Sequence, residues 1–190
     1  IATPVFAHTV DFLYGDYMAQ EHTEGRTGEL ICGSEGITRL LDKYGIDTDA
    51  VTDYHIYPIA DNDSPRLSAD RLEYTLGNLA AYTGRTAAEL QAYYDDLSVA
   101  VNERGETELS FTCADTAYRF AHDALEMSRI YVSDEDRYAM QMLSELLGRA
   151  LKKGVLRAEE LYLTEETVIE KLLSDAETAG LWRGYCALHE

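Results

Sequence analysis

The chain has 190 residues, of which 46% are hydrophobic and only three are proline, and its 16 basic and 35 acidic side chains give a formal net charge of -19 at pH 7. This length and apolar content predict one domain spanning residues 1–190, with a sizeable core. The acidic balance has the wrong sign for holding duplex phosphates, so duplex nucleic acid is excluded as an expected partner. A small anionic ligand needs local help from a metal ion or a few placed arginines.

The sequence shows neither a membrane segment nor a cysteine framework. No stretch of bilayer-spanning length is free of charged residues, and no basic start precedes an apolar run as in a signal peptide. Cys32, Cys113 and Cys186 lie far apart and form no Cys-x-x-Cys pair, which argues against disulfides and against a thiolate zinc site. We therefore expect a protein of the reducing cytoplasm with no membrane contact. Because the chain opens with Ile1 rather than Met, we also expect that an upstream segment has been removed.

Hydrophobic periodicity predicts helix nearly throughout, and therefore an all-α fold. If the first segment, residues 4–11, is helical, His8 and Asp11 lie three residues apart on one face, where the carboxylate can orient the imidazole. Such a pair is a common general-acid device and is equally common as a plain surface pair. His22, which lies among acidic residues, either joins this site or is simply exposed to solvent.

The next predicted helix covers residues 34–45. Ser34 has the position of an N-cap and Gly45 that of a left-handed C-terminal residue. The apolar residues between them share one helical face: Ile37, Leu40, Leu41 and Tyr44. An irregular segment over residues 52–67 follows, and its aromatic and proline content predicts a functional or tightly packed loop.

The segment after this loop, residues 67–78, is the most informative one. On a helix, Asp70, Tyr74 and Asn78 recur every four residues along one face, with Arg71 beside them. A carboxylate suits a hard cation, and a guanidinium grips phosphate oxygens in a planar fork. The pattern therefore suits a metal ion held by Asp70 and a phosphate held by Arg71 and Tyr74. A solvated helix surface is the alternative that spacing alone leaves open.

A capping-box pair, Thr86 and Glu89, predicts a further helix whose apolar positions run to Val101, with Gly105 closing the segment. Residues 106–112 alternate apolar and polar side chains, which indicates a short extended stretch without an obvious partner.

Two more helices are predicted toward the C-terminus. The first opens at Ser133 and Asp136 and ends before Gly154, and its apolar residues fall at helical spacing. The second begins near Thr164.

Taken in this order, the segments resemble the HD superfamily of metal-dependent phosphohydrolases, within it the deoxynucleoside-triphosphate triphosphohydrolase-like branch. The stretch from Ile1 to Asp11 is similar to the branch's His-Asp-Ile-Gly-His-Pro-Pro-Phe-Gly-His motif and the acidic residue after it, with the leading His-Asp missing. The resemblance thus implies a chain truncated at its N-terminal His-Asp motif. The family's Asp-Lys/Arg-x-Asp/Glu-Tyr motif is matched at every specified position by Asp70-Arg-Leu-Glu-Tyr74.

The resemblance implies a multi-helix HD-domain bundle and a role for each matched residue. Asp70 becomes a metal ligand, and Arg71, Tyr74 and Arg129 contact substrate phosphates. The catalytic residues become His8, its acidic partner Asp11, and His22. The cofactor is a divalent metal ion, with Mn, Mg, Fe, Ni and Zn not distinguished. Because the leading His-Asp pair is missing, the chain as written is expected to hold its metal weakly or not at all.

The sequence therefore predicts a metal-dependent phosphohydrolase of a nucleotide or another small phosphate ester, in which metal-activated water attacks phosphorus. The alternative is a catalytically inactive HD-fold module that binds a nucleotide or a protein partner. A third reading is an ordinary helical interaction domain whose polar clusters are surface features. A homo-oligomer is compatible with each of the three.

Overall fold

The computed structural model describes residues 4–19, 22–63 and 65–189. In this part of the chain it shows ten α-helices, several short 3-10 turns and one two-stranded sheet. The chain divides into two compact units, Ile1–Thr52 with Ser133–Glu190 as unit 1 and Asp53–Val132 as unit 2. The expected single domain over residues 1–190 stays a prediction, and each unit is described by itself below. No helix of the described residues combines the length and apolar character that crossing a membrane requires.

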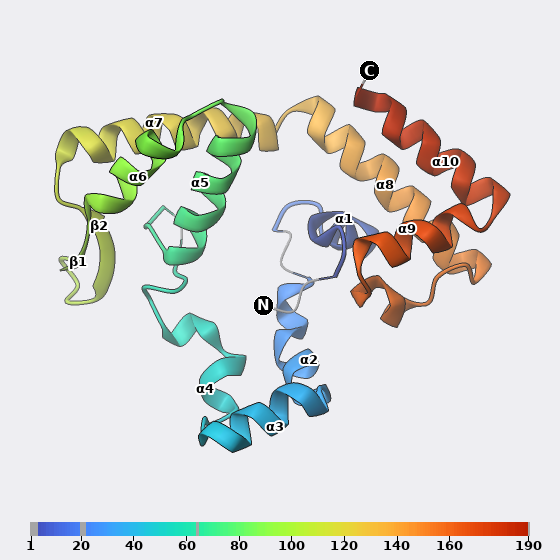
Figure 1. Ribbon diagram of the computed structural model, residues 1–190, viewed down its shortest axis with the longest axis horizontal. Helices are drawn as coiled ribbons and strands as arrows, with labels where there is room; N and C mark the ends of the chain where they lie inside the picture. Colours follow the sequence, from blue (N-terminus) through green and yellow to red (C-terminus); the bar gives the residue numbers. More distant parts are fainter. Residues whose placement is uncertain (1–3, 20–21, 64, 190) are drawn as a thin grey trace. The chain divides into compact units, whose positions relative to one another are not determined.

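Unit 1 contains seven of the described helices. They are α1 (Ala7–Leu13), α2 (Thr27–Gly33), α3 (Glu35–Tyr44), α4 (Asp49–Thr52), α8 (Asp134–Lys153), α9 (Glu165–Leu173) and α10 (Ala176–Cys186). Helix α8 packs against α1 and α10, and α10 also packs against α9 (Figure 1). Their buried apolar residues form the core of the unit: Val10, Leu143, Leu146, Leu147, Ala150, Leu156, Leu161, Val168 and Leu172. Four of these lie on one stripe of α8, at the spacing that the sequence shows.

The helix boundaries of unit 1 follow local capping chemistry. The Ser34 hydroxyl accepts the Ile37 N–H at the start of α3, and the Ser133 hydroxyl accepts the Asp136 N–H at the start of α8. Gly45 and Gly154 end these helices at φ 64° and 74°, a left-handed conformation that glycine adopts without a steric penalty. The predicted start and end of both helices are confirmed.

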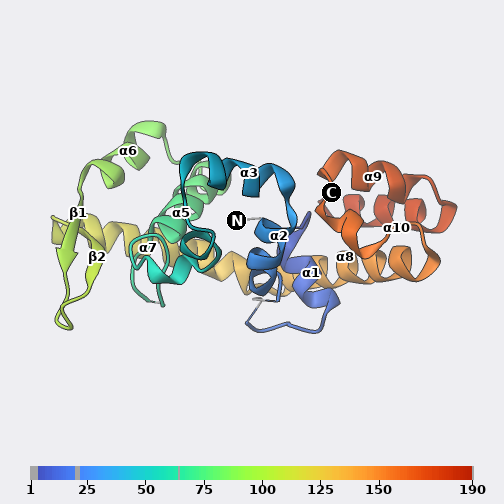
Figure 2. The ribbon, with the colours of Figure 1, turned by 90° about the horizontal axis from the view of Figure 1, so that it is seen from below.

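Unit 2 contains three helices and a β-hairpin in the described residues. They are α5 (Ala69–Tyr82), α6 (Ala87–Asp95), β1 (Leu97–Val101), β2 (Thr107–Phe111) and α7 (Ala114–Tyr131). The strands pair antiparallel, with Leu97 opposite Phe111 and Val101 opposite Thr107. Helix α5 contacts α6 and α7, and α7 contacts β2, as Figure 2 shows from a second direction. The core of the unit is built on Leu72, Tyr93 and Phe120.

Two predictions from the sequence are wrong in the region of the hairpin. The helix predicted to run on to Val101 ends at Asp95, and Gly105 lies in the hairpin turn at φ 79°. Residues 97–101 fit a helical spacing, but Leu-Ser-Val-Ala-Val also alternates and contains two β-branched residues, and its pairing with β2 decides for the strand. The fold is therefore mostly helical with a small sheet.

Candidate functional site

The residues predicted to form one site fall in both units. Those in unit 1 are His8, Asp11 and His22, and those in unit 2 are Asp70, Arg71, Tyr74 and Arg129. The structure thus describes two halves, each within its own unit, and their union in one site stays a prediction.

In unit 1 a fully buried carboxylate, Asp11, faces an exposed imidazole, His8. One Asp11 oxygen, Oδ1, accepts the Thr23 backbone N–H at 2.9 Å, and the other, Oδ2, lies 3.4 Å from His8 Nδ1. The His8 side chain is 63% exposed. The carboxylate is therefore fixed on one side by the backbone and orients on its other side a ring that solvent and ligands can reach. The structure brings this predicted pair together on α1.

His22 contacts two residues that follow α1. Its backbone N–H donates to Asp16 Oδ2 at 3.2 Å, and its ring stacks on that of Tyr14 with the centroids 4.3 Å apart. The next residue, Thr23, supplies the N–H that holds Asp11. The segment carrying His22 is thereby tied to the buried carboxylate beside His8.

Helix α8 places a further carboxylate, Asp136, near His8. The sequence analysis predicted Asp136 only as a residue of the helix start. Partial burial raises the pKa of Asp136, while the nearby charges of Arg137 and His8 oppose this rise. The Arg137 guanidinium donates to the Tyr17 carbonyl at 2.8 Å and lies over the Phe12 ring. The surroundings of His8 therefore include residues more than 120 positions away, which local patterns do not reveal.

In unit 2, Asp70, Arg71 and Tyr74, three of the four predicted phosphate- and metal-binding residues, lie in the first half of α5. Ser68 is buried and caps the helix by accepting the Arg71 N–H at 3.1 Å. Partial burial raises the pKa of Asp70, helped by the charge of Asp61 and opposed by Arg71. Burial likewise raises the pKa of Tyr74, which favours the neutral phenol that can donate a hydrogen bond.

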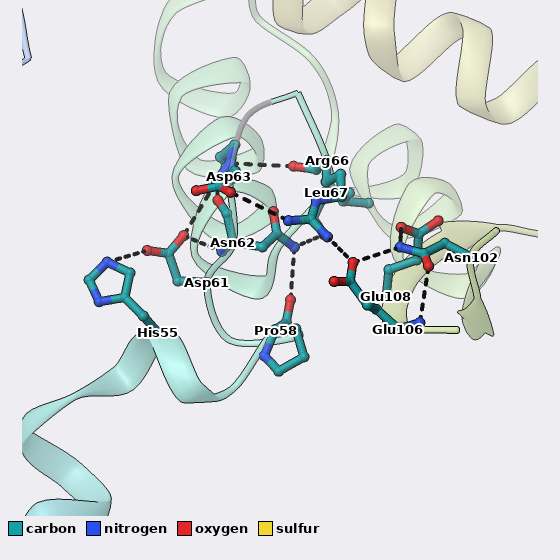
Figure 3. A network of polar contacts seen from close by, with 11 residues as sticks. His55, Pro58, Asp61, Asn62, Asp63, Arg66, Leu67, Asn102, Glu106 and Glu108 are labelled. Carbon is teal, nitrogen blue, oxygen red and sulfur yellow. Dashed lines mark hydrogen bonds and ion pairs between the residues drawn. The ribbon is translucent and has the colours of Figure 1, made fainter. Parts of the chain in front are cut away.

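The Arg71 guanidinium closes the loop that precedes α5. It donates to the carbonyls of Asn62 and Arg66 and lies 3.4 Å from Asp61 Oδ1. Its Nε is buried and has no hydrogen-bond partner in the described part of the chain. The Asn62 side-chain amide donates to the carbonyls of Pro58 and Leu67 (Figure 3). Arg71 thus holds a compact loop, in addition to any contact with a ligand.

A groove of about 620 Å³ runs between this loop, α5, β2 and α7. Among the described residues that line it, the charged ones are both arginines, Arg66 and Arg71, and no carboxylate takes part. Tyr74 and Tyr131 add two phenols, and the Asn78 amide donates to the Tyr131 hydroxyl. The apolar lining includes Leu67, Leu109, Phe111, Phe120 and Met127. Arg129, predicted to reach phosphates, lies in the last turn of α7 and is not part of this lining.

Unit 2 holds a second polar centre that the sequence reading did not find. The buried Asp123 carboxylate accepts the Tyr93 hydroxyl at 2.7 Å and lies 2.6 Å from an Arg85 guanidinium nitrogen. Burial and the hydrogen bond to Asp123 raise the pKa of Tyr93 to about 12. These residues line a separate cavity of about 430 Å³ between α6 and α7. Because α6 and α7 are separated by the hairpin, no sequence spacing indicates this cluster.

The side chains that the structure describes do not by themselves make a metal site. No three His, Cys, Asp or Glu side chains gather there as such a site requires. Asp70, the predicted ligand, offers a single carboxylate, and one carboxylate holds a divalent cation weakly.

Comparison with known proteins finds a relative and no family assignment. No protein-family model matches the chain, and neither does any solved structure. The chain is 25% identical over 175 residues to the uncharacterized protein YdhJ of Bacillus subtilis (strain 168), an alignment that covers 90% of this chain and 51% of YdhJ. The chain therefore spans about half the length of this relative. Membership of the HD superfamily stays an expectation from the sequence motifs.

Proposed function

We propose that the chain belongs to an HD-family phosphohydrolase of a nucleotide or another small phosphate ester. The groove of unit 2 carries this proposal. On a chain with a net charge of -19, the charged side chains lining that groove are two arginines, and the rest of its lining is largely apolar and aromatic. A ligand with an anionic end and a flat apolar end matches this lining, and a nucleotide has both.

In this proposal the polar end of the groove binds the phosphate and the apolar end binds the base. Tyr74 offers an O–H donor to phosphate oxygens, and the Arg71 guanidinium, which the loop holds at the groove, adds a positive charge that attracts them. Phe111 and Phe120, whose ring centroids lie 5.1 Å apart, form part of the apolar lining that a base can contact. Burial of the base and attraction of the phosphate to the positively charged end of the groove together account for substrate affinity.

The hydrolytic part of the proposal rests on His8. An exposed imidazole that a buried carboxylate orients, as Asp11 orients His8, can donate a proton to a leaving oxygen, the role of a general acid. The resemblance implies a divalent metal ion with Asp70 as one ligand. Since the described residues offer no complete ligand set, the proposal gives no step to that ion.

The experiment measures phosphate release by the chain from a panel of nucleoside mono- and triphosphates, with Mn²⁺ or Mg²⁺ added. His8→Ala is expected to lower turnover about 100-fold or more without weakening nucleotide binding, the usual loss on removing a general acid. Arg71→Ala is expected to weaken binding instead. His122→Ala, an exposed histidine of α7 outside the groove, serves as the control and should leave both unchanged. Absence of release from every nucleotide, or unchanged release by His8→Ala, contradicts the proposal.

A second candidate function is nucleotide binding without turnover. It is favoured by the groove being complete within unit 2, so that binding there does not need the His8–Asp11 pair. Nucleotide then raises the melting temperature of the chain, since a ligand that binds only the folded state stabilises it, while no phosphate is released.

A further inference from the structure

Arg66 lines the groove of unit 2 and is bound by a carboxylate from the hairpin turn. Its Nη1 lies 2.6 Å from Glu106 Oε2, and its Nη2 lies 3.7 Å from Asp63 Oδ2 (Figure 3). The two partners differ in setting, because the Asp63 side chain is almost fully exposed whereas Glu106 is 45% exposed. The short contact with Glu106 therefore dominates the neutralisation of Arg66.

The hairpin turn holds Glu106 in this position. The Asn102 side-chain oxygen accepts the N–H groups of Arg104 and Glu106, at 2.9 and 3.0 Å. Its amide group donates to Glu106 Oε2 at 3.2 Å and to Glu108 Oε2 at 3.1 Å. The bond from Asn102, and then the nearby Arg66, hold the pKa of Glu106 below its usual range. Glu106 is thus an anion at neutral pH whose carboxylate is already aimed at Arg66.

We propose that Arg66 is a phosphate-binding residue of the groove and that Glu106 is a built-in competitor for it, occupying the guanidinium until a ligand phosphate replaces the carboxylate. This inference takes its ligand class, a phosphorylated small molecule, from the proposed function. It adds a residue to the phosphate end of the groove and a reason for selectivity among phosphates.

The two arginines of the groove differ in how easily their partners can be exchanged. Arg71 is held mainly by backbone carbonyls inside the loop, which cannot leave without unfolding it. Glu106 is a half-exposed side chain, and water can solvate its carboxylate once it turns away. Arg66 is therefore the arginine that a phosphate can take over. A phosphate group carries more negative charge than a carboxylate and therefore gains from the exchange, so phosphorylated ligands are favoured over neutral nucleosides.

The test is calorimetric titration of the chain with tripolyphosphate, nucleoside triphosphates and the matching nucleosides. Glu106→Gln removes the charge and keeps an oxygen for the Asn102 amide. It is expected to tighten tripolyphosphate and triphosphate binding roughly fivefold, the size of an exposed ion pair, and to leave nucleoside binding unchanged. Glu108→Gln is the matched control, since Glu108 shares the Asn102 bond and makes no ion pair with Arg66.

Arg66→Gln is expected to weaken triphosphate binding. In the double variant Glu106→Gln, Arg66→Gln, triphosphate binding should be no tighter than in Arg66→Gln alone. Unchanged or weaker triphosphate binding in Glu106→Gln overturns the inference. So does tighter triphosphate binding in Glu106→Gln that persists when Arg66 is also replaced. Failure of both the parent chain and Glu106→Gln to bind any of the phosphates overturns it as well. If the ion pair only fastens the hairpin, melting temperature moves and phosphate affinity does not. If Glu106→Gln binds triphosphate more tightly but the chain releases no phosphate, only the proposed hydrolysis is contradicted. If the chain releases phosphate but Glu106→Gln does not change triphosphate affinity, only the competition between Glu106 and phosphate is contradicted.

Discussion

Asp11 combines a structural and a functional contact in one side chain. Replacing it by Ala leaves the Thr23 N–H buried without its acceptor, so Asp11→Ala is expected to lower the free energy of unfolding by about 1–3 kcal/mol. Urea denaturation measures this loss. His8→Ala provides the comparison, because the exposed imidazole leaves few contacts to lose, and its free energy of unfolding should stay close to that of the parent chain. Equal losses in both variants would contradict the assignment of Asp11 as the anchor of the pair.

Tyr93 gives the chain a pH dependence at the alkaline end. Its pKa rises from 10.0 to about 12 because burial and the bond to Asp123 favour the neutral phenol in the folded state. A raised folded-state pKa contributes stability that is complete below pH 10 and is lost as the pH rises from 10 through 12. We expect the free energy of unfolding to fall less steeply over this interval in Tyr93→Phe than in the parent chain. Denaturation at a series of pH values compares the two, and identical slopes would contradict the assignment.

The predictability of the site differs from residue to residue. Asp70, Arg71 and Tyr74 share the start of one helix, so helical periodicity was enough to group them, and His8 with Asp11 followed from a spacing of three. Arg66 meets Glu106 across 40 positions, and Arg85 meets Asp123 across 38. Such pairs depend on how the hairpin and α7 fold back, and no local pattern encodes them. The loop-closing role of Arg71 also depends on that tertiary arrangement.

At the scale of elements, the start of α5 connects local folding to the groove. Ser68→Ala removes the cap of this helix and is expected to lower the free energy of unfolding by about 1 kcal/mol. Because the first turn of α5 carries Arg71, nucleotide affinity should fall as well. Thr86→Ala removes the cap of α6 in the same unit and is expected to cost a similar amount without changing affinity. Chemical denaturation and nucleotide titration of both variants separate the two effects, and equal affinities contradict the link between cap and groove.

The sequence predicted best those helices whose start is fixed by a local capping residue. The capping box of Thr86 and Glu89 starts α6 as expected, and Thr164 caps α9. The hairpin was only half predicted, because a strand is stabilised by its partner and Leu97–Val101 carried both helical and alternating spacing. The groove depends on this element, since β2 supplies Leu109 and Phe111 to its wall. The sequence indicated the extended stretch of β2 but not its partner strand, so it did not show that β2 forms a wall of a groove.

At the scale of the whole molecule, the two units have separate cores, and this separation predicts how the chain unfolds. The core of unit 1 contains Leu147 and that of unit 2 contains Phe120, and none of the residues that the structure describes belongs to both cores. Removing either side chain leaves a cavity, so Leu147→Ala and Phe120→Ala are each expected to cost about 2–5 kcal/mol. If the units unfold separately, each substitution lowers the protection of amides in its own unit and leaves the other unit protected. Hydrogen exchange followed residue by residue measures this, and loss of protection throughout the chain in both variants would instead support the single cooperative domain expected from the sequence.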